Sequence, residues 1–248
     1  MSTEPNRAAW LQGPAAKCQP EPTASYACWR VILLGAPGVG KGTQAQLLHE
    51  RLRACHLSTG DVFRAAATQK DCVPTPAMAR ALECMRRGEL VADETVWEMV
   101  RERAGCLRCG GGFLLDGFPR TLAQAQLLDD FLRGEKLTLN AVINYELPVA
   151  EIVSRLSGRR TCSQCKAVYH VSNQPPRREG ICDRCGGALF QREDDRAESI
   201  RVRLDAYERS TAPLIEFYRG QGLLVAVAAS GSPEEICDRA MEELQSRV

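Results

Sequence analysis

The most informative part of the chain reads VILLGAPGVGKGTQAQLL and spans residues 31–48. A short apolar strand, 31–34, leads into the glycine loop 35–43, and a helical pattern follows. Glycines let backbone N–H groups converge on an anion, the start of a helix adds a partial positive charge, and Lys41 adds a full one. The pattern G-x-x-x-x-G-K is typical of a P-loop, although Gly42 stands where many such loops carry a magnesium-binding Ser or Thr. The stretch therefore predicts binding of a nucleoside triphosphate, with a glycine-rich turn and an incidental lysine as the alternative.

The composition narrows the classes of protein to which the chain can belong. Its 248 residues carry a net charge of +1, so no strong field points to nucleic acid or to an anionic membrane. No apolar run approaches the ~18 residues of a membrane-spanning helix. Residues 1–29 are rich in proline, lack the apolar core of a secretory signal and contain acidic residues that argue against a transit peptide. We expect a disordered N-terminal extension on a cytoplasmic monomer whose twelve cysteines are reduced or bound to metal.

Apolar runs of strand length alternate with amphipathic segments along the rest of the chain. Strands are predicted at 31–34, 55–58, 113–116, 141–146 and 223–228, and helices at 41–53, 75–87, 93–103, 122–133, 149–157, 195–219 and 233–247. This alternation predicts an α/β fold with a doubly wound parallel sheet of five strands, which binds ligands at the carboxyl ends of its strands. Two insertions, 59–91 and 158–195, interrupt the pattern and leave 30–58, 92–157 and 196–248 as the core domain.

Four cysteines in the second insertion have the spacing of a metal site. Cys162-x-x-Cys165 and Cys182-x-x-Cys185 are separated by a segment long enough for a small hairpin, so four sulfurs can face one ion. Four thiolates suit a tetrahedral, structural Zn2+, which would supply much of the folding free energy of so small a segment. Free thiols or two disulfides are the alternatives. The pair Cys106-x-x-Cys109 has no second pair nearby in sequence, and we expect ordinary loop thiols there.

Further segments follow the predicted strands or flank the cysteines. LSTGDVFR (57–64) follows the second strand, and LDGFPRT (115–121) follows the third, with Gln124 one helical turn beyond it. SGRR (157–160) enters the cysteine segment and QREDD (191–195) leaves it. Together with the P-loop, these motifs resemble the adenylate kinase family, specifically its long-lid, zinc-containing, bacterial-type form. The resemblance covers the chain from about residue 30 to the C-terminus.

The resemblance implies phosphoryl transfer from Mg-ATP to AMP and assigns roles to matching residues. Catalytic roles fall on Lys41, Arg120, Arg159, Arg192, Arg203 and Asp116, the last of which would orient waters around Mg2+. The implied ATP site comprises Gly38, Val39, Gly40, Lys41, Gly42, Thr43, Arg155, Arg159, Val168, Tyr169 and Gly231. The implied AMP site comprises Thr59, Arg64, Glu89, Leu90, Val91, Gly117, Phe118, Pro119, Arg120, Gln124, Arg192 and Arg203. Guanidinium groups suit such sites because they bind phosphate oxygens bidentately and stay charged.

Base selection is expected to depend on Thr59 and Gln124, because a glutamine amide both donates to and accepts from the edge of adenine. Arg155 is expected to stack on the adenine of ATP, a contact that tolerates other bases. The resemblance makes Asp194 the partner of the lid arginines. Asp195, with Glu198 three residues later, instead has the pattern of a capping box at the start of a helix.

The chain departs from the family pattern in four places. Residues 73–78 replace a usual glycine-threonine-proline turn, and Ala92 replaces a common proline. The loop 106–112 is rich in cysteine and glycine, and the N-terminal extension has no counterpart. The first two differences bear on the affinity for AMP rather than on the class of reaction.

The sequence thus predicts an enzyme, a nucleoside monophosphate kinase that gives two ADP and whose two mobile insertions close to exclude water. Its partners are expected to be ATP and AMP, without nucleic acid or membrane. Two alternatives remain open. One is a kinase with another monophosphate as acceptor. The other is a non-catalytic nucleotide sensor whose zinc hairpin, with Arg177 and Arg178, binds nucleic acid or protein, against which the near-neutral charge argues.

Overall fold

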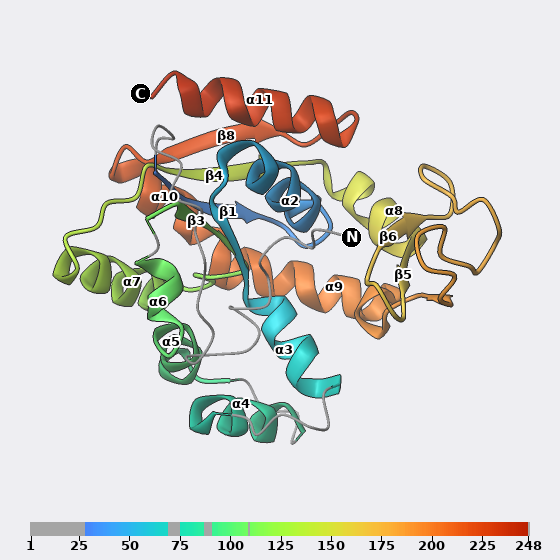
Figure 1. Ribbon diagram of the computed structural model, residues 1–248, viewed down its shortest axis with the longest axis horizontal. Helices are drawn as coiled ribbons and strands as arrows, with labels where there is room; N and C mark the ends of the chain where they lie inside the picture. The colour runs from blue at the N-terminus through green and yellow to red at the C-terminus, as the bar shows by residue number, and fades with distance from the viewer. Residues whose placement is uncertain (1–27, 69–74, 87–90, 109, 248) are drawn as a thin grey trace.

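Five parallel strands in the order β2-β3-β1-β4-β8 form the main sheet of the computed structural model, which describes residues 28–68, 75–86, 91–108 and 110–247 (Figure 1). The strands are β1 (Trp29–Gly35), β2 (Cys55–Ser58), β3 (Gly112–Asp116), β4 (Ala141–Glu146) and β8 (Leu224–Ala228). The first strand lies in the centre. On one side the chain reaches the edge strand β2 before β3 fills the place next to β1, and on the other side it adds β4 and then β8. The predicted fold class is confirmed, and the predicted bounds of β2 and β4 match those of the structure.

Helices cover both faces of this sheet. The helices on one face are α2 (Lys41–Leu52), α8 (Val149–Gly158) and α11 (Pro233–Gln245). Those on the other are α4 (Pro76–Arg86), α5 (Asp93–Arg101), α6 (Ala104–Leu107), α7 (Leu122–Gly134) and α10 (Pro213–Gly220). In β1, Val31 and Leu33 enter the first core while Ile32 and Leu34 enter the second, and all four side chains are buried. A strand buried on both faces explains why β1 is a continuous apolar run rather than an alternating one.

The carboxyl ends of three neighbouring strands meet at one edge of the sheet. Leu33 of β1 pairs with Asp116 of β3, and Ser58 of β2 pairs with the same Asp116. The loops that follow these strands therefore start side by side. This edge is where a parallel sheet of this kind binds its ligands.

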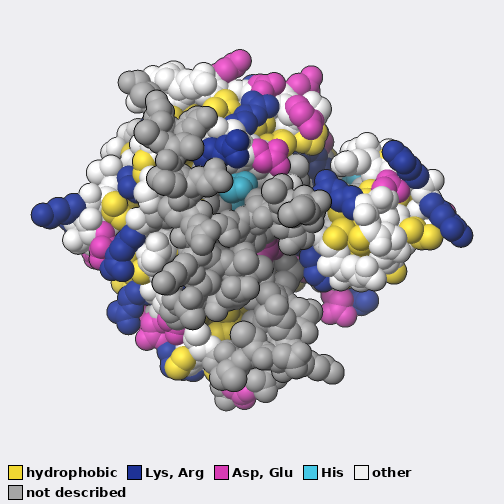
Figure 2. All heavy atoms as spheres, viewed as in Figure 1, with side chains coloured by type: hydrophobic (Ala, Val, Ile, Leu, Met, Phe, Trp, Pro, Cys, Tyr) yellow, Lys and Arg dark blue, Asp and Glu magenta, His cyan; other side chains and the backbone are white. Residues whose placement is uncertain are grey.

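The segment 158–195, called the lid here, forms a separate lobe. It contains β5 (Arg159–Cys162), β6 (Val168–His170) and β7 (Leu189–Phe190), paired antiparallel in the order β6-β5-β7, and ends in a short 3-10 turn, Glu193–Asp195. Figure 2 shows it protruding from the rest of the molecule with lysine and arginine side chains on its outer side.

The prediction of one continuous helix over 195–219 is wrong. The structure has α9 (Ala197–Ala206), a π-helical turn at Tyr207–Thr211 and then α10. The N–H of Ala212 donates to the carbonyl of Tyr207, five residues back. Pro213 begins α10 and has no N–H to continue an α-helical ladder, so the wider turn accommodates it.

The first insertion begins with a helix that was not predicted, α3 (Thr59–Thr68), and continues with the predicted one, α4. Several expectations lie outside the described residues: most of the extension, at 1–27, the turn at 73 and 74, Glu89, Leu90 and Cys109, as well as the side chain of Arg64. Within the described ranges, no helix has the length and apolar character needed to cross a membrane.

Candidate active site

The loop between β1 and α2 has a backbone that requires glycine at two positions. Gly40 is the N-cap of α2 and has a φ of 102°, in the left-handed region. At Gly35, a Cβ would lie 2.6 Å from the carbonyl oxygen of Tyr145 on β4. Gly38, Val39, Gly42 and Thr43 belong to the same loop and to the first turn of α2. The first N–H groups of α2 are therefore presented at the carboxyl end of β1, where an anion is stabilised.

Lys41 begins α2 and folds its side chain back over this loop. Its Nζ donates to the carbonyl oxygens of Gly35 at 2.6 Å and Ala36 at 3.0 Å. The pKa of Lys41 is lowered to about 8, chiefly because burial disfavours its charged form. The charged groups that also act on it are Asp116, which raises the pKa, and Arg120, Arg203 and Arg159, which lower it. Residues far apart in the sequence thus bring their charges to one ammonium group.

Asp116 ends β3 beside the P-loop, and a buried histidine accompanies it. Nε2 of His56 lies 3.5 Å from Oδ2 of Asp116. Burial alone would raise the pKa of Asp116, but His56, Lys41 and Arg120 outweigh it, and the pKa is lowered. A Cβ on Gly42 would lie 3.7 Å from the same Oδ2, so the carboxylate faces the start of α2. Asp116 is thereby kept as a carboxylate next to the phosphate loop.

Arg120 follows β3 in the segment Gly117–Arg120, in which the Phe118–Pro119 peptide is cis. Its backbone N–H donates to Oε1 of Gln124 at 2.8 Å, and its carbonyl accepts from Thr211 Oγ1 at 2.9 Å. Its Nε donates to the carbonyl of Gly117 at 2.8 Å. The backbone of this exposed arginine is therefore held from both sides, by α7 and by the π-helical turn.

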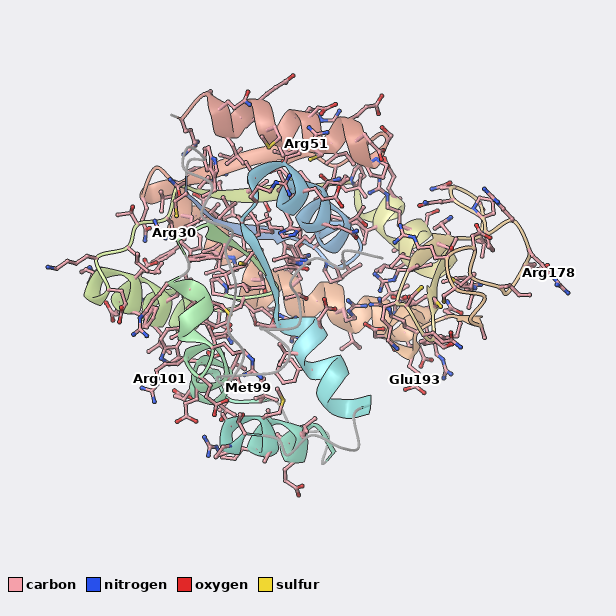
Figure 3. All side chains as sticks on the ribbon, viewed as in Figure 1. Arg30, Arg51, Met99, Arg101, Arg178 and Glu193 are labelled. Carbon is pink, nitrogen blue, oxygen red and sulfur yellow. The ribbon has the colours of Figure 1, made fainter. Side chains whose placement is uncertain are left out.

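An apolar hollow lies between α3 and α5. Its lining comprises Thr59, Val62, Phe63, Val96, Met99, Val100 and Arg103. Thr59 is buried and donates through Oγ1 to the carbonyl of Gly117 at 2.9 Å. In Figure 3 Met99 marks the α5 side of this region. Val91 packs against the same core, and Thr59 is the residue of the predicted AMP site that lines the hollow itself.

Two lid arginines are held by acidic or hydroxyl groups of their own lobe. Arg159 makes a bidentate pair with Asp195, through Nε–Oδ2 at 2.7 Å and Nη2–Oδ1 at 2.5 Å. Nε of Arg192 donates to Oγ1 of Thr161 at 2.9 Å. Arg203 of α9 reaches Oδ2 of Asp194 at 2.9 Å and Oδ1 of Asp195 at 3.5 Å.

The predicted capping box at Asp195 is therefore wrong. Its carboxylate is fully buried between Arg159 and Arg203, and the N-cap of α9 is Arg196, without a side-chain cap. Asp194, the expected partner of the lid arginines, contacts Arg203, while Asp195 holds Arg159. A capping box does occur at Ser232 and Glu235, where α11 begins.

The remaining predicted ATP residues lie around the P-loop and at the base of the lid. Arg155 of α8 donates to the carbonyls of Ala229 at 2.8 Å and Val39 at 3.4 Å, and so ties the P-loop to the loop that contains Gly231. Val168 on β6 is exposed, whereas the side chain of Tyr169 is buried in the cysteine cluster.

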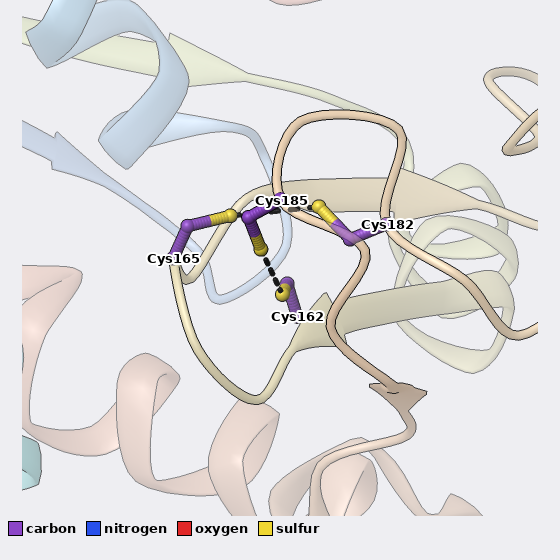
Figure 4. A group of neighbouring side chains, drawn as sticks. All are labelled: Cys162, Cys165, Cys182 and Cys185. Atoms are coloured by element: carbon purple, nitrogen blue, oxygen red, sulfur yellow. Dashed lines mark hydrogen bonds between the residues drawn. The ribbon is translucent and has the colours of Figure 1, made fainter. Parts of the chain in front are cut away.

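The four predicted metal ligands come together in the lid (Figure 4). Their sulfurs all lie within 4.8 Å of one another, and the Cys162–Cys185 and Cys165–Cys182 pairs are 3.5 Å apart. Four thiolates at about 2.3 Å from one zinc ion would be separated by about 3.8 Å, so this donor set fits a tetrahedral ion. The hydroxyl of Tyr169 lies 3.5 Å from the sulfur of Cys182, and this contact lowers the pKa of that thiol. The geometry supports a four-cysteine metal site.

The structure adds residues that the motifs did not indicate. His56 sits inside an apolar strand run, and nothing in its sequence context marks it. Thr211 bonds to Arg120 across the fold, a contact that sequence spacing does not reveal. Asp93 was recognisable as the first residue of a predicted helix, but its partners Thr121 and Gln124 were not.

Comparisons with known proteins agree with this geometry. A model of the adenylate kinase family matches residues 33–223. The chain is 48% identical over 216 residues to a protein named adenylate kinase from Carboxydothermus hydrogenoformans, a match that covers 87% of this chain and 99% of the relative. It is 46% identical over 217 residues to the adenylate kinases of Streptomyces coelicolor, with 87% and 98% covered, and Caldicellulosiruptor bescii, with 88% and 98% covered.

Proposed function

The chain belongs to the adenylate kinase family, and from that premise we propose how its own residues carry out the reaction. The enzyme is a nucleoside monophosphate kinase that transfers a phosphoryl group reversibly from ATP to AMP and gives two ADP. An oxygen of the AMP phosphate bonds to the γ-phosphorus of ATP, and the bond from that phosphorus to the β–γ bridging oxygen breaks. Such a transfer requires positioning and neutralisation of charge rather than covalent chemistry by the protein.

The donor phosphates bind to the loop 35–43. The N–H groups at the start of α2 and the ammonium of Lys41 face this loop, and the hydrogen bonds of Lys41 to two loop carbonyls hold it ready. Phosphate oxygens would replace those carbonyls as its partners. The negative charge of the phosphates also removes the electrostatic cost of a partly buried ammonium among arginines.

Magnesium accompanies ATP in this proposal and would neutralise part of the phosphate charge when bound. Asp116 is the residue that would hold its waters. The carboxylate ends a central strand, faces the start of α2 and has a lowered pKa, which suits a ligand to a hard cation.

The acceptor, AMP, binds with its base over the hollow between α3 and α5 and its phosphate at Arg120. Thr59 and Gln124 are the polar groups near the base, and Gly117, Phe118 and Pro119 form the backbone that leads to Arg120. The family resemblance adds Arg64, Glu89, Leu90 and Val91 to this site.

Closure of the lid brings its arginines, together with Arg203 of α9, to the transferred phosphoryl group and excludes water. Arg159, Arg192 and Arg203 would surround it, and a water molecule would otherwise attack the same phosphorus. The charges of Arg159 and Arg203 already act on Lys41 in this structure, which supports their convergence. The family resemblance adds Arg155, Val168 and Gly231 to the ATP side of the cleft, and Tyr169 only through its backbone, because its side chain is buried in the cysteine cluster.

Zinc in the four-cysteine site keeps the lid folded without entering the chemistry. Four protein ligands leave no open position for a substrate, which is the pattern of a structural ion. We extend the proposal to the division into a core (30–58, 92–157 and 196–248), an AMP-binding insertion (59–91) and the lid, in a cytoplasmic monomer without nucleic-acid or membrane partners. The net charge of +1 is consistent with such partners being small nucleotides.

The observation that carries the proposal is the gathering of Lys41, Asp116, Arg120, Arg159 and Arg203 at one site. A coupled assay of ADP formation from ATP, with AMP, GMP, CMP and UMP in turn, tests it. We expect AMP to be the preferred acceptor. Lys41→Met keeps the aliphatic stem but removes the ammonium, and we expect it to lower turnover at least about a hundredfold.

Circular dichroism and urea unfolding of Lys41→Met verify that the fold persists. Near-normal turnover in this folded variant would remove the P-loop assignment, and preference for another monophosphate would overturn AMP as acceptor.

A further inference from the structure

The side-chain amide of Gln124 is held between two partners. Its Oε1 accepts from the backbone N–H of Arg120 at 2.8 Å, and its Nε2 donates to Oδ1 of Asp93 at 2.7 Å. The other carboxylate oxygen of Asp93 accepts from Thr121 Oγ1 at 2.8 Å. Gln124 is only 4% exposed, so bulk water cannot readily replace these partners.

Both partners have unambiguous polarity. A backbone N–H can only donate, and a carboxylate can only accept. An amide turned by 180° would place its oxygen against the carboxylate and its NH2 group against the N–H. Both hydrogen bonds would be lost, and like dipoles would face each other. The amide therefore has one stable orientation.

Asp93 also lies on the face of α5 that lines the hollow. Residues 93, 96 and 100 are spaced i, i+3 and i+7, which places them on one side of a helix. Val96 and Val100 line the hollow directly, and Thr59 contributes to its opposite wall. Asp93, which holds the amide of Gln124, and the α5 wall of the hollow are thus parts of one helix face.

The held amide retains one N–H and one oxygen lone pair for a ligand. A 6-aminopurine presents a donor at position 6 and an acceptor at N1, whereas a 6-oxopurine presents an acceptor and a donor at the same two positions. A freely turning amide can match either base, but a fixed one matches one of them.

We propose that Asp93 is a positioning residue that selects 6-aminopurine over 6-oxopurine monophosphates by fixing the amide orientation of Gln124. This inference rests on the proposed role of Gln124 in recognising the base. It goes further because it assigns the selectivity to the carboxylate of Asp93, which accepts a hydrogen bond from Gln124.

The test compares AMP with inosine monophosphate, which differs from AMP only at position 6 and in the proton on N1. We expect Asp93→Ala to lower the ratio of kcat/KM for AMP to that for inosine monophosphate by about three- to tenfold. The N–H of Arg120 then holds the amide alone, so part of the discrimination of a bidentate base contact is lost. Asp93→Asn keeps an oxygen that can accept from Nε2, and we expect it to restore most of the ratio. Because both substrates are assayed on one preparation, partial unfolding cancels from the ratio.

Thr121→Val is the matched structural control. It removes the other hydrogen bond to Asp93 and the N-cap of α7, so it should reduce stability while the ratio stays within about twofold of the parent value. A ratio that is unchanged in Asp93→Ala, or that falls equally in Thr121→Val, overturns the inference.

Gln124→Leu separates this inference from the proposed function. If Gln124→Leu abolishes the preference for AMP while Asp93→Ala preserves it, the base site is correct and only the role of Asp93 is wrong. If Gln124→Leu itself leaves the preference intact, the proposed base contact of Gln124 fails, and the inference fails with it.

Discussion

Lys41 holds a positive charge at a position that disfavours it. The ammonium is partly buried and lies among three arginines, and its pKa falls from 10.5 to about 8. Between those two values the unfolded chain binds more protons than the folded one, so stability contributed by this group rises with pH. The charged lysine destabilises the ligand-free fold at neutral pH by up to about 3 kcal/mol, and the destabilisation vanishes above about pH 10.5.

We therefore expect the stability difference between Lys41→Met and the parent to depend on pH. At pH 7.5 the variant lacks the destabilising charge, which raises its free energy of unfolding relative to that of the parent. About 2 kcal/mol of this difference should be lost by pH 9.5. Urea unfolding at the two pH values measures it. Lys136→Met removes one charge at an exposed position and is the control. If the difference in free energy of unfolding between Lys41→Met and the parent is the same at both pH values, the charge of Lys41 does not destabilise the fold.

Single residues differ in how far the sequence could reveal them. Lys41 and the four lid cysteines were recognisable because their chemistry depends on local spacing. Asp195 was misread because the pattern D-x-x-E is local, whereas its true partner, Arg159, is 36 positions away. His56 was missed because a histidine in an apolar strand becomes informative only when the neighbouring strand brings Asp116 beside it.

Whole elements, too, were predictable where their signal is local in the sequence. The five strands were predictable because apolar runs between glycine and polar turns are a local signal, and both faces of each central strand are buried. The break in 195–219 was not predicted, although Pro213 was visible, because the helical periodicity continues through it. The helix α3 begins inside the S-T-G-D motif, at Thr59, and the functional interpretation of that motif obscured its helical character.

The lid is the element whose stability depends most on its metal. The lid has an apolar cluster that is separate from the two cores of the main sheet. It consists of Cys162, Tyr169 and Cys182, with Ala167 and Leu189 packed against it. So small a cluster cannot offset the conformational entropy of a lid of about forty residues. Two of its three central members are metal ligands, so loss of the ion removes the centre of the lobe.

Cys165→Ser should abolish stoichiometric zinc binding and lower the thermal midpoint by at least several degrees, in line with a loss of more than 1 kcal/mol. Metal analysis by mass spectrometry and differential scanning calorimetry measure the two effects. Cys84→Ser, in α4 and outside the quartet, should change neither. A midpoint that is unchanged after verified loss of zinc would refute the structural role of the ion.

At the scale of the whole molecule, the charged groups of the proposed site come from three parts of the fold. The core supplies Lys41 and Asp116, the segment after β3 supplies Arg120, and the lid and α9 supply Arg159 and Arg203. Bringing these cations closer without a ligand increases their mutual repulsion. Burial is the main cause of the lowered pKa of Lys41, and Arg120, Arg203 and Arg159 lower it further. The closure that we propose would therefore require the negative charge of the nucleotide phosphates.

A bisubstrate mimic with two adenosines joined by five phosphates should contract the protein, because its bridge neutralises all of these cations at once. Small-angle scattering should show a smaller radius of gyration with the mimic than without it. Adenosine alone offers the same base but no charge, and it should leave the radius unchanged. In crystals of the complex, Arg192 should have left Thr161 for the phosphate bridge. A bound mimic with the lid still apart and Arg192 still on Thr161 would contradict closure driven by phosphate charge, because the anion would then be present without its effect.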